Sequence, residues 1–216
     1  MRKRMTPVMK PNFTTDNRKF MNPIDPRPIL RHFYPEDTPL RRLLITHSAQ
    51  VRDKALELAH SPAGEAMNLD LALVETGAML HDIGILRCHA PKILCNGPEP
   101  YLAHGLIGAN MLREYAGQHG IDLEPFARIC ERHTGSGITA DEVRLQQLPI
   151  PEQDFLPETP EEILVCLADK FYSKSGDMQE KSLPRIRRSL EKFGPGPLAR
   201  FDAMCRLFDL KPELKP

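Results

Sequence analysis

The sequence predicts an all-α protein of about seven helices. Three observations support this fold class: apolar residues recur at helical spacing after residue 38, residues typical of helix starts precede several of these segments, and strand signals are scarce. The chain has 216 residues, of which 41% are hydrophobic and 27% charged, as in ordinary globular proteins. No apolar run approaches the roughly 18 residues that a membrane span needs, so we expect no membrane partner.

The N-terminal part is expected to precede the helical domain. Residues 1–26 contain four prolines and little apolar periodicity, which favours an extension, and a connector should follow up to Pro39. We therefore assign residues 1–37 to an extension and connector, and residues 38–210 to the domain. The first helix of the domain should begin with Thr38 as its N-cap and Pro39 at its first position.

The remaining helices follow in order along the chain. The second is apolar nearly all round, which is typical of the middle of a bundle, and the fifth opens with the capping box Thr-Pro-Glu-Glu. The two C-terminal amphipathic helices could complete the core, which we favour, or form an interface, so the sequence allows a homodimer. We expect these helices near 68–84, 101–116, 122–133, 159–169, 183–193 and 197–209.

Two connectors are too long for simple turns. Residues 87–100 and 134–158 are candidates for binding loops or lids, although the second is as consistent with a variable surface insertion.

Charge and cysteine content narrow the class of protein. The first 20 residues and residues 170–216 each carry a net charge of +5, and the middle of the chain carries −10. This acidic middle argues against a nucleic-acid partner, whereas the basic C-terminal part could meet a small anionic substrate. Five cysteines without a CxxC pair, and a basic N-terminus without an apolar segment behind it, favour the cytoplasm over a disulfide scaffold or a secreted protein.

Polar residues interrupt the apolar faces of several predicted helices. A single histidine in such a place is usually an ordinary core residue, but here four histidines and two aspartates share the pattern. An ionised carboxylate buried without a partner is strongly destabilising, and a carboxylate at a helix C-terminus also faces the negative end of the helix dipole. A bound divalent cation would resolve both problems. The six residues are His47, His81, Asp82, His104, His133 and Asp169.

The types of these side chains indicate the kind of metal site. Nitrogen and oxygen ligands without cysteine suit iron, manganese, cobalt or zinc in an open coordination, with nickel and magnesium as further options. Six protein ligands are too many for one catalytic ion with an open position, so they predict two divalent metal ions with a bridging carboxylate and an activated hydroxide.

The ordered set H…HD…H…H…D, with the motif HDIG at residues 81–84, resembles the HD-domain superfamily of metal-dependent phosphohydrolases. The resemblance covers about residues 38–175 and implies an all-α fold. It implies that His47, His81, Asp82 and Asp169 hold one metal, with Asp82 bridging, and that His104 and His133 complete the second site. His81 and Asp82 would then lie at the centre of catalysis. The implied activity is hydrolysis of a phosphoester or phosphoanhydride bond in a nucleotide or related small metabolite.

Narrower assignments remain open within this superfamily. The stretch His133-Thr134-Gly135 resembles the HTxG of symmetrical diadenosine tetraphosphate hydrolases, which are dinuclear HD proteins. The HD-GYP phosphodiesterases typically continue HDIG with lysine, but this chain has Ile85 and no GYP-like stretch. Mixed-valent di-iron oxygenases use nearly the same ligands, and a non-catalytic nucleotide-binding module is a third alternative that ranks last because no ligand is missing.

Cationic and loop residues are candidates for contacts with a phosphorylated substrate. Lys170 should point away from the metals because it directly follows Asp169 and is rotated by about 100° on a helix. Lys92 and His89 in the first long connector are weaker candidates, His89 as a general acid. The main candidates are Lys174, Arg128, Arg132, Arg87, Thr134 and Gly135, the last two through backbone N–H groups.

Overall fold

A computed structural model describes residues 20–211 of the chain. It confirms the all-α fold class, and the expected extension over residues 1–19 lies outside the described residues. The described part contains ten α-helices: α1 (Pro26–Phe33), α2 (Pro39–Ala59), α3 (Pro62–Glu65), α4 (Leu71–Leu80), α5 (His104–His119), α6 (Glu124–Arg132), α7 (Ala140–Gln146), α8 (Pro160–Asp169), α9 (Leu183–Leu190) and α10 (Pro195–Leu207).

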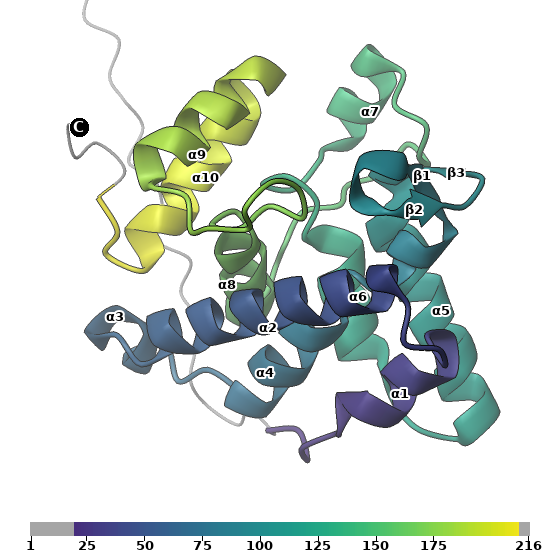
Figure 1. Ribbon diagram of the computed structural model, residues 1–216. Helices are drawn as coiled ribbons and strands as arrows, with labels where there is room; N and C mark the ends of the chain where they lie inside the picture. The colour runs from purple at the N-terminus through teal and green to yellow at the C-terminus, as the bar shows by residue number, and fades with distance from the viewer. Residues whose placement is uncertain (1–19, 212–216) are drawn as a thin grey trace, which may run out of the picture.

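The long helix α2 organises the bundle (Figure 1). It packs against α4 and α8, while α5 packs against α6 and α4 against α6. Two large apolar cores result, and a smaller cluster contains Ile138, Val143 and Phe155. One lies between α2, α4, α8, α9 and α10, and the other between α1, α2, α4, α5 and α6. The C-terminal helices complete the first core, as expected, because Phe201 and Cys205 of α10 are fully buried in it.

Local sequence explains where the central helices begin. Thr38 and Thr159 each accept a hydrogen bond from a backbone N–H of the first turn, and Thr159 forms the predicted capping box with Glu162. The predicted start of the second helix near Asn68 moves to Asp70, whose carboxylate caps α4 by accepting from the Leu73 N–H at 3.1 Å.

The structure corrects the expected connector before residue 38. Asp25 caps α1 and Pro26 occupies its first position, so residues 26–33 are helical. Ile29 and Leu30 are buried in the core. The Tyr34 hydroxyl donates to the Ile83 carbonyl oxygen at 2.8 Å and accepts from the Leu86 N–H at 3.1 Å. This helix therefore anchors the segment that directly follows His81-Asp82.

Both long connectors contain regular structure that the sequence did not reveal. The first forms a three-stranded sheet in which β1 (Cys88–Ala90) pairs antiparallel with β2 (Cys95–Asn96) and parallel with β3 (Glu99–Pro100). The second contains α7, capped by Thr139. The small sheet and α7 face α9 and α10 across the same side of the bundle (Figure 1).

Gly84 allows two backbones to approach closely. We expected it to end the second helix, but α4 ends at Leu80, and Gly84 lies in the 3₁₀ turn η1 (Ile83–Arg87). A Cβ atom there would lie 2.1 Å from the His104 carbonyl oxygen and 2.4 Å from the Gly108 nitrogen. Only glycine lets η1 lie this close to α5, and this contact brings His81 and Asp82 next to His104.

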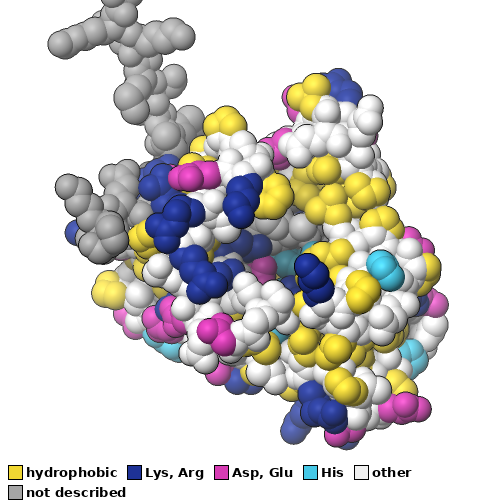
Figure 2. All heavy atoms as spheres, turned by 45° about the horizontal axis from the view of Figure 1, so that its top comes forward, with side chains coloured by type: hydrophobic (Ala, Val, Ile, Leu, Met, Phe, Trp, Pro, Cys, Tyr) yellow, Lys and Arg dark blue, Asp and Glu magenta, His cyan; other side chains and the backbone are white. Residues whose placement is uncertain are grey.

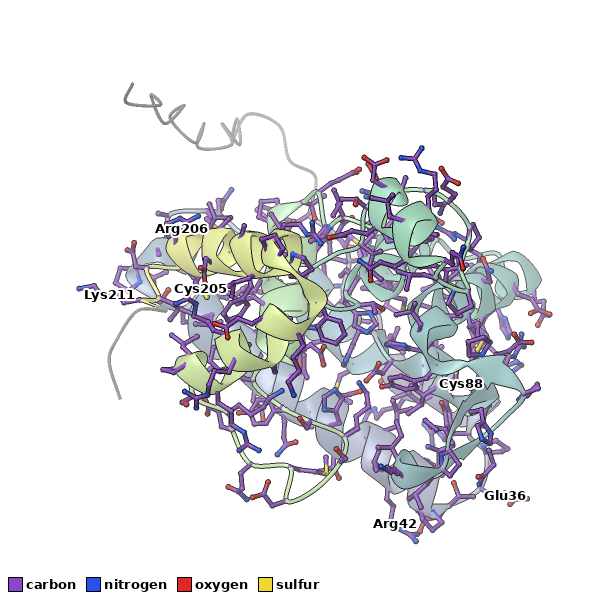
Figure 3. All side chains as sticks on the ribbon, turned by 90° about the horizontal axis from the view of Figure 1, so that it is seen from above. Glu36, Arg42, Cys88, Cys205, Arg206 and Lys211 are labelled. Atoms are coloured by element: carbon purple, nitrogen blue, oxygen red, sulfur yellow. The ribbon has the colours of Figure 1, made fainter. Side chains whose placement is uncertain are left out.

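Two further features concern the cysteines and the hydropathy of the helices. All five cysteines are buried and unpaired, and Cys88 and Cys205 lie at opposite ends of the molecule (Figure 3). Among the described residues, no helix combines the length and hydropathy that crossing a bilayer requires.

Candidate metal centre

The structure brings together all six residues that the sequence selected, from five helices. His47 lies in the middle of α2, His81 and Asp82 follow the last turn of α4, and the other three lie at helix ends. His104 begins α5, His133 caps the C-terminus of α6, and Asp169 ends α8. All six are buried, with at most 8% of any residue exposed.

Asp82 lies between two groups of histidines. Its Oδ2 atom is 3.2 Å from Nε2 of His47 and 3.1 Å from Nε2 of His81. Its Oδ1 atom is 3.3 Å from Nε2 of His104 and 3.4 Å from Nε2 of His133. Each carboxylate oxygen therefore faces a different pair of imidazoles.

Donor atoms in each group lie within 4.8 Å of one another. The first group is His47, His81, Asp82 and Asp169, and the second is Asp82, His104 and His133. Asp169 closes the first group because its Oδ1 atom is 3.0 Å from Nε2 of His47 and 3.6 Å from Nε2 of His81.

Backbone carbonyl groups fix the orientation of three imidazole rings. In each ring Nδ1 lies against the carbonyl oxygen of the residue three positions earlier, and a carbonyl oxygen can only accept. Nδ1 must therefore carry the hydrogen, which leaves Nε2 as the metal-binding atom and is the usual outer support of a histidine ligand. The pairs are His81 with Ala78 at 2.6 Å, His104 with Tyr101 at 2.7 Å and His133 with Cys130 at 2.7 Å.

Several atoms in the centre are buried without a hydrogen-bond partner. They are Nε2 of His81, both carboxylate oxygens of Asp82 and Nδ1 of His47. Nε2 of His81 and the two oxygens of Asp82 nevertheless lie at ion-pair distance from neighbouring charged or imidazole groups. A buried carboxylate is strongly unfavourable unless positive charge lies beside it, so the donor set fits divalent cation binding.

Positive charge surrounds the two carboxylates. Burial raises the pKa of Asp82, but the charges on His81 and Lys174 outweigh it and hold that pKa well below its usual value. Lys174 Nζ is 2.6 Å from Asp82 Oδ2, and Lys170 Nζ is 2.7 Å from Asp169 Oδ2. The pKa of Asp169 is also lowered, because the charges of these two lysines outweigh the effect of burial.

The pKa values of His81 and His133 shift in opposite directions. Burial lowers the pKa of His81, but the neighbouring Asp82 and Asp169 raise it to about 9. Burial also lowers the pKa of His133, and because His81 and His104 add to this effect, the value falls to about 3. In the protein without metal these shifts favour the protonated form of His81 and the neutral form of His133, which is the form that a metal requires.

A cleft of about 380 Å³ opens above the centre and is rich in lysine. Lys92, Lys170, Lys174 and Lys181 line it together with Asp169 and the rings of Tyr101 and Tyr172. Figure 2 shows Lys and Arg side chains along one side of this hollow and hydrophobic side chains along the other. We call this space the lysine cleft. Its positive charge suits a phosphorylated molecule.

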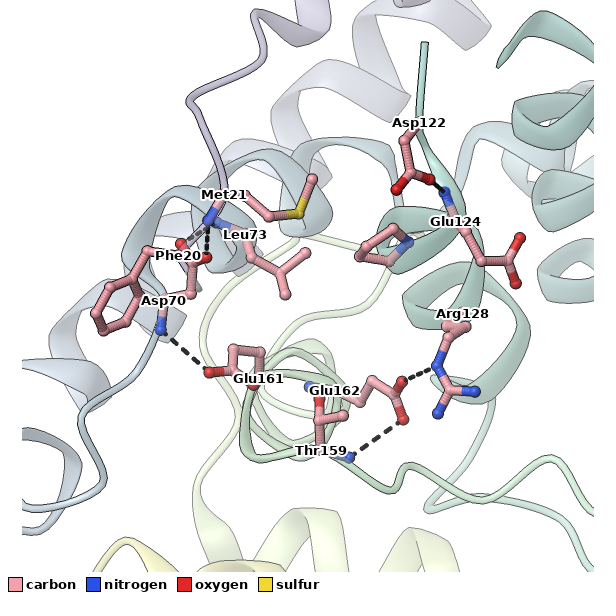
Figure 4. A pocket seen from close by; sticks show the side chains of 11 residues that line it. Phe20, Met21, Asp70, Leu73, Asp122, Glu124, Arg128, Thr159, Glu161 and Glu162 are labelled. Carbon is pink, nitrogen blue, oxygen red and sulfur yellow. Dashed lines mark hydrogen bonds and ion pairs between the residues drawn. The ribbon is translucent and has the colours of Figure 1, made fainter. Parts of the chain in front are cut away.

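The substrate contacts expected from the sequence lie in several different places. Lys174 lies in the lysine cleft. Arg128 lies on a separate pocket, where it pairs with Glu162 at 2.7 Å (Figure 4). It also pairs with Glu158 at 2.7 Å. Arg132 pairs with Glu158 at 2.8 Å and donates to the Leu156 carbonyl oxygen at 2.7 Å. The structure thus engages both arginines in holding the loop before α8 and does not bring them to the centre.

Apart from Lys92, which lines the lysine cleft, the loop candidates lie outside it. Arg87 is exposed on η1, and His89 is exposed on β1. Thr134 and Gly135 line an adjacent cavity. The expectation for Lys170 was wrong in part, since Lys170 Nζ lies in the cleft and also donates to the His133 carbonyl oxygen at 3.2 Å.

Two residues of the cleft were missed by sequence reasoning. The Tyr101 ring stacks on His104 with centroids 4.7 Å apart, and Lys174 Nζ lies 6.0 Å from the centre of the same ring. Lys181 lies at the cleft because its backbone N–H donates to the Phe171 carbonyl oxygen at 2.8 Å. This bond closes the loop after α8. Burial lowers the pKa of Lys181 to about 8. The spacing of Tyr101 three residues before His104 was the available signal for the first, and nothing local marks the second.

Fold and site together define an all-α protein with a buried histidine–aspartate centre suited to divalent cations. The HD domain family matches residues 44–173, more than half of the chain. The chain belongs to the HD-domain family, which confirms the resemblance.

Relatives of the chain include archaeal proteins. An uncharacterized protein of Methanocaldococcus jannaschii is 38% identical over 128 residues, which is 59% of this chain and 65% of that protein. The tRNA (cytidine(56)-2'-O)-methyltransferases of Picrophilus torridus and Thermoplasma volcanium are 34% and 33% identical over 65% and 64% of this chain, but over only 35% and 33% of their own lengths. The chain thus spans less than two thirds of each of these relatives.

Solved structures with a similar course of the chain include the HD domain of the phosphodiesterase PgpH from L. monocytogenes. The TM-score is 0.45 at 15% identity, over 84% of this chain and 96% of that domain. The same domain in complex with cyclic-di-AMP matches with the same TM-score and identity.

Proposed function

We propose that this protein is a dinuclear metal-dependent phosphohydrolase that cleaves a phosphoester or phosphoanhydride bond of a small phosphorylated metabolite, in particular a nucleotide. The observation that carries the proposal is the position of Asp82, whose two carboxylate oxygens each face a different group of imidazole nitrogens at 3.1–3.4 Å.

The residues present would hold two divalent cations. His47, His81, Asp82 and Asp169 would bind one, and Asp82, His104 and His133 the other. Cations at these positions would lower the pKa of a water molecule and neutralise the charge that develops on phosphoryl oxygens. Manganese and iron are the metals to test first, since the donor set combines imidazole nitrogen with carboxylate oxygen.

The protein's own groups bind and orient the substrate. The ammonium groups of the lysine cleft would hold phosphoryl oxygens beside the centre, with Lys174 nearest because it already lies against Asp82. Tyr101 holds the His104 ring in place by stacking. No cysteine nucleophile is needed, and burial raises the pKa of the Cys166 thiol to about 11, so that this thiol is protonated at neutral pH.

A product assay tests the proposal. The protein, prepared metal-free and then loaded with Mn(II) or Fe(II), is incubated with mononucleotides, dinucleoside polyphosphates, cyclic dinucleotides and sugar phosphates, and products are separated by chromatography. Transfer RNA is included because two relatives carry it in their names. Metal-dependent release of a defined product from a small phosphorylated substrate is expected. Two bound metals with no hydrolysis, but with oxygen consumption by the iron form, would instead indicate the oxygenase chemistry.

A further inference from the structure

The helix that follows the lysine cleft carries a row of positive charge. Residues 181–193 contain five basic side chains and one acidic one, Glu191. One of the five, Arg187, pairs with Asp202 at 3.0 Å. The other four follow one another at intervals of four, three and four residues, which is the spacing of neighbours on one face of a helix. They are Lys181, Arg185, Arg188 and Lys192, and we call them the basic stripe.

The stripe lies on the solvent side of α9. Ile186 and Leu190 turn the other side of the helix into the core, with 1% and 6% exposed. Arg185 and Arg188 are exposed, and so is Lys192 in the 3₁₀ turn η4 (Glu191–Phe193). Within residues 20–211, no carboxylate forms an ion pair with any of these three cations. Their charge is therefore not neutralised by a neighbouring acidic side chain.

The stripe begins inside the lysine cleft. Lys181 lines the cleft together with Lys170 and Lys174, and Arg185 follows about one helical turn later. Burial lowers the pKa of Lys181, and the charges of Lys170 and Arg185 lower it further. Figure 2 shows Lys and Arg side chains gathered on the side of the hollow that α9 forms. The cleft and the stripe therefore make one continuous region of positive charge.

The stripe is longer than one phosphate group. The seven residues from Arg185 to Lys192 rise by about 10 Å along the helix axis, and Lys181 extends the row into the cleft. A small monophosphate can meet only one or two of these cations at hydrogen-bond distance. A row of regularly spaced cations that leads away from a phosphate-binding cleft suits a ligand whose negative charge repeats, as along a nucleic-acid backbone.

The surroundings of the stripe favour a nucleic-acid strand over an anionic membrane. A helix that lies on a membrane needs apolar side chains beside its cations, but Ile186 and Leu190 are buried in the core. Phe193 directly follows Lys192 and is 63% exposed. Cations that follow a backbone, with an aromatic ring on which a base can stack, are the usual construction of a surface for single strands.

We propose that the basic stripe binds a single-stranded nucleic acid, with phosphates of the strand along its four cations and a base stacked on Phe193. This inference goes beyond the proposed function, since the partner is a macromolecule and its binding needs neither metal nor hydrolysis. The net charge along the chain argued against such a partner. The fold, however, places five acidic residues of the middle of the chain around the separate pocket of Figure 4.

Fluorescence anisotropy with a labelled oligouridylate of about 12 nucleotides tests the proposal. The full chain is used with EDTA, which keeps the metal centre from acting on the strand. Four phosphate contacts predict a slope of about −2.8 for the logarithm of the binding constant against the logarithm of the salt concentration. Binding should therefore be about 50-fold weaker at 200 mM than at 50 mM NaCl.

Other probes identify the partner. Oligothymidylate of the same length distinguishes RNA from DNA, and binding of either strand supports the proposal. Binding of neither strand at 50 mM NaCl would overturn it, as would tighter binding to the matching duplex or to vesicles that contain phosphatidylserine. The proposed function is judged separately, by the metal-dependent product assay with small phosphorylated substrates.

Variants locate the binding surface. The double substitution Arg188→Gln and Lys192→Gln removes two contacts and should bring the slope to about −1.4. Arg31→Gln with Arg42→Gln is the matched control, because it removes the same charge from exposed positions on α1 and α2, across the molecule from α9 (Figure 1). The control should keep the slope of the wild type. The same slope in the stripe variant and the wild type, or an equal change in both double variants, would refute the stripe.

Stacking on Phe193 has a different signature. Phe193→Ala should weaken binding about 5- to 150-fold at every salt concentration without changing the slope, because the stacking of a base releases no ions. Unchanged affinity of this variant would overturn the assignment of Phe193.

Discussion

Replacing Asp82 with asparagine perturbs the centre with the least change of shape. The substitution keeps the size of the side chain but removes the charge that both groups of ligands share. Asp82 is fully buried, and Lys174, the nearest cation, has only 11% of its side chain exposed. In the metal-free protein the variant leaves this ammonium buried with Asp169 as its remaining carboxylate in the centre.

The size of the effect follows from this burial. Removing one partner of a buried ion pair costs about 3–5 kcal/mol of unfolding free energy. For a chain of this length that corresponds to a fall in Tm of about 6–20 °C. The metal-loaded wild type should gain a further increment of about 2.7 kcal/mol for each site at a metal concentration one hundred times Kd, and Asp82→Asn should lose this increment.

Thermal unfolding followed by circular dichroism, with EDTA and with increasing Mn(II), measures both effects. Asp53→Asn is the matched control, since its side chain is 67% exposed on the same helix as His47 and lies outside the centre. Wild type and control should rise in Tm with Mn(II), while Asp82→Asn starts lower and does not respond. A variant that binds two metal ions with wild-type affinity would refute the bridging role of Asp82.

Three further predictions concern neighbouring groups. Lys174→Met should lower kcat/KM for the phosphorylated substrate about 100-fold, measured by steady-state kinetics. It should not weaken Mn(II) binding, because the Lys174 ammonium competes with cations for Asp82. Weaker Mn(II) binding by the variant in calorimetry would contradict this competition. Arg200→Ala should lower the free energy of unfolding, measured in urea, by about 2–3 kcal/mol, because the Ser136 carbonyl oxygen and the Glu142 carboxylate lose their hydrogen bonds to Arg200. A loss below about 1 kcal/mol would contradict a stabilising role of Arg200. Burial raises the pKa of Glu142, but the Thr139 N–H and Arg200 outweigh burial and lower this pKa below 4.5. The Glu142 carboxylate therefore stabilises the fold above pH 4.5, and this stabilisation is lost as the pH falls through the lowered pKa. The free energies of unfolding of wild type and Glu142→Gln in urea should differ at pH 7 and converge in acid.

Helices with strong local signals could be predicted from the sequence. The helix after Thr38 and the helix after Thr159 begin where their caps indicate, because capping depends on neighbours within one turn. Helix α1 was missed because its stability comes from contacts with distant residues, such as that of Tyr34 with Ile83. The small sheet was missed for a similar reason, since its strands have only two or three residues each and depend on pairing.

The metal centre was more predictable than the substrate contacts. Ionisable residues on apolar helix faces destabilise the fold unless they have a partner such as a metal ion. The sequence places each of the six residues on such a face or at its end, so this conflict can be recognised without a structure. Arg128 and Arg132 carry no such conflict. An arginine beside a histidine ligand in sequence can equally pair with acidic residues of another segment, and both pair with Glu158.

The sequence by itself determined the fold class, the set of six buried polar residues and the family, because apolar periodicity, caps and the ordered histidine and aspartate motif are properties of local chain segments. The tertiary structure alone decided that Asp82 lies between two pairs of imidazoles and that Lys181 lies at the lysine cleft, where the basic stripe begins. These features depend on how helices distant in sequence pack against one another. Distances between side chains on different helices follow from that packing, and no local pattern encodes them.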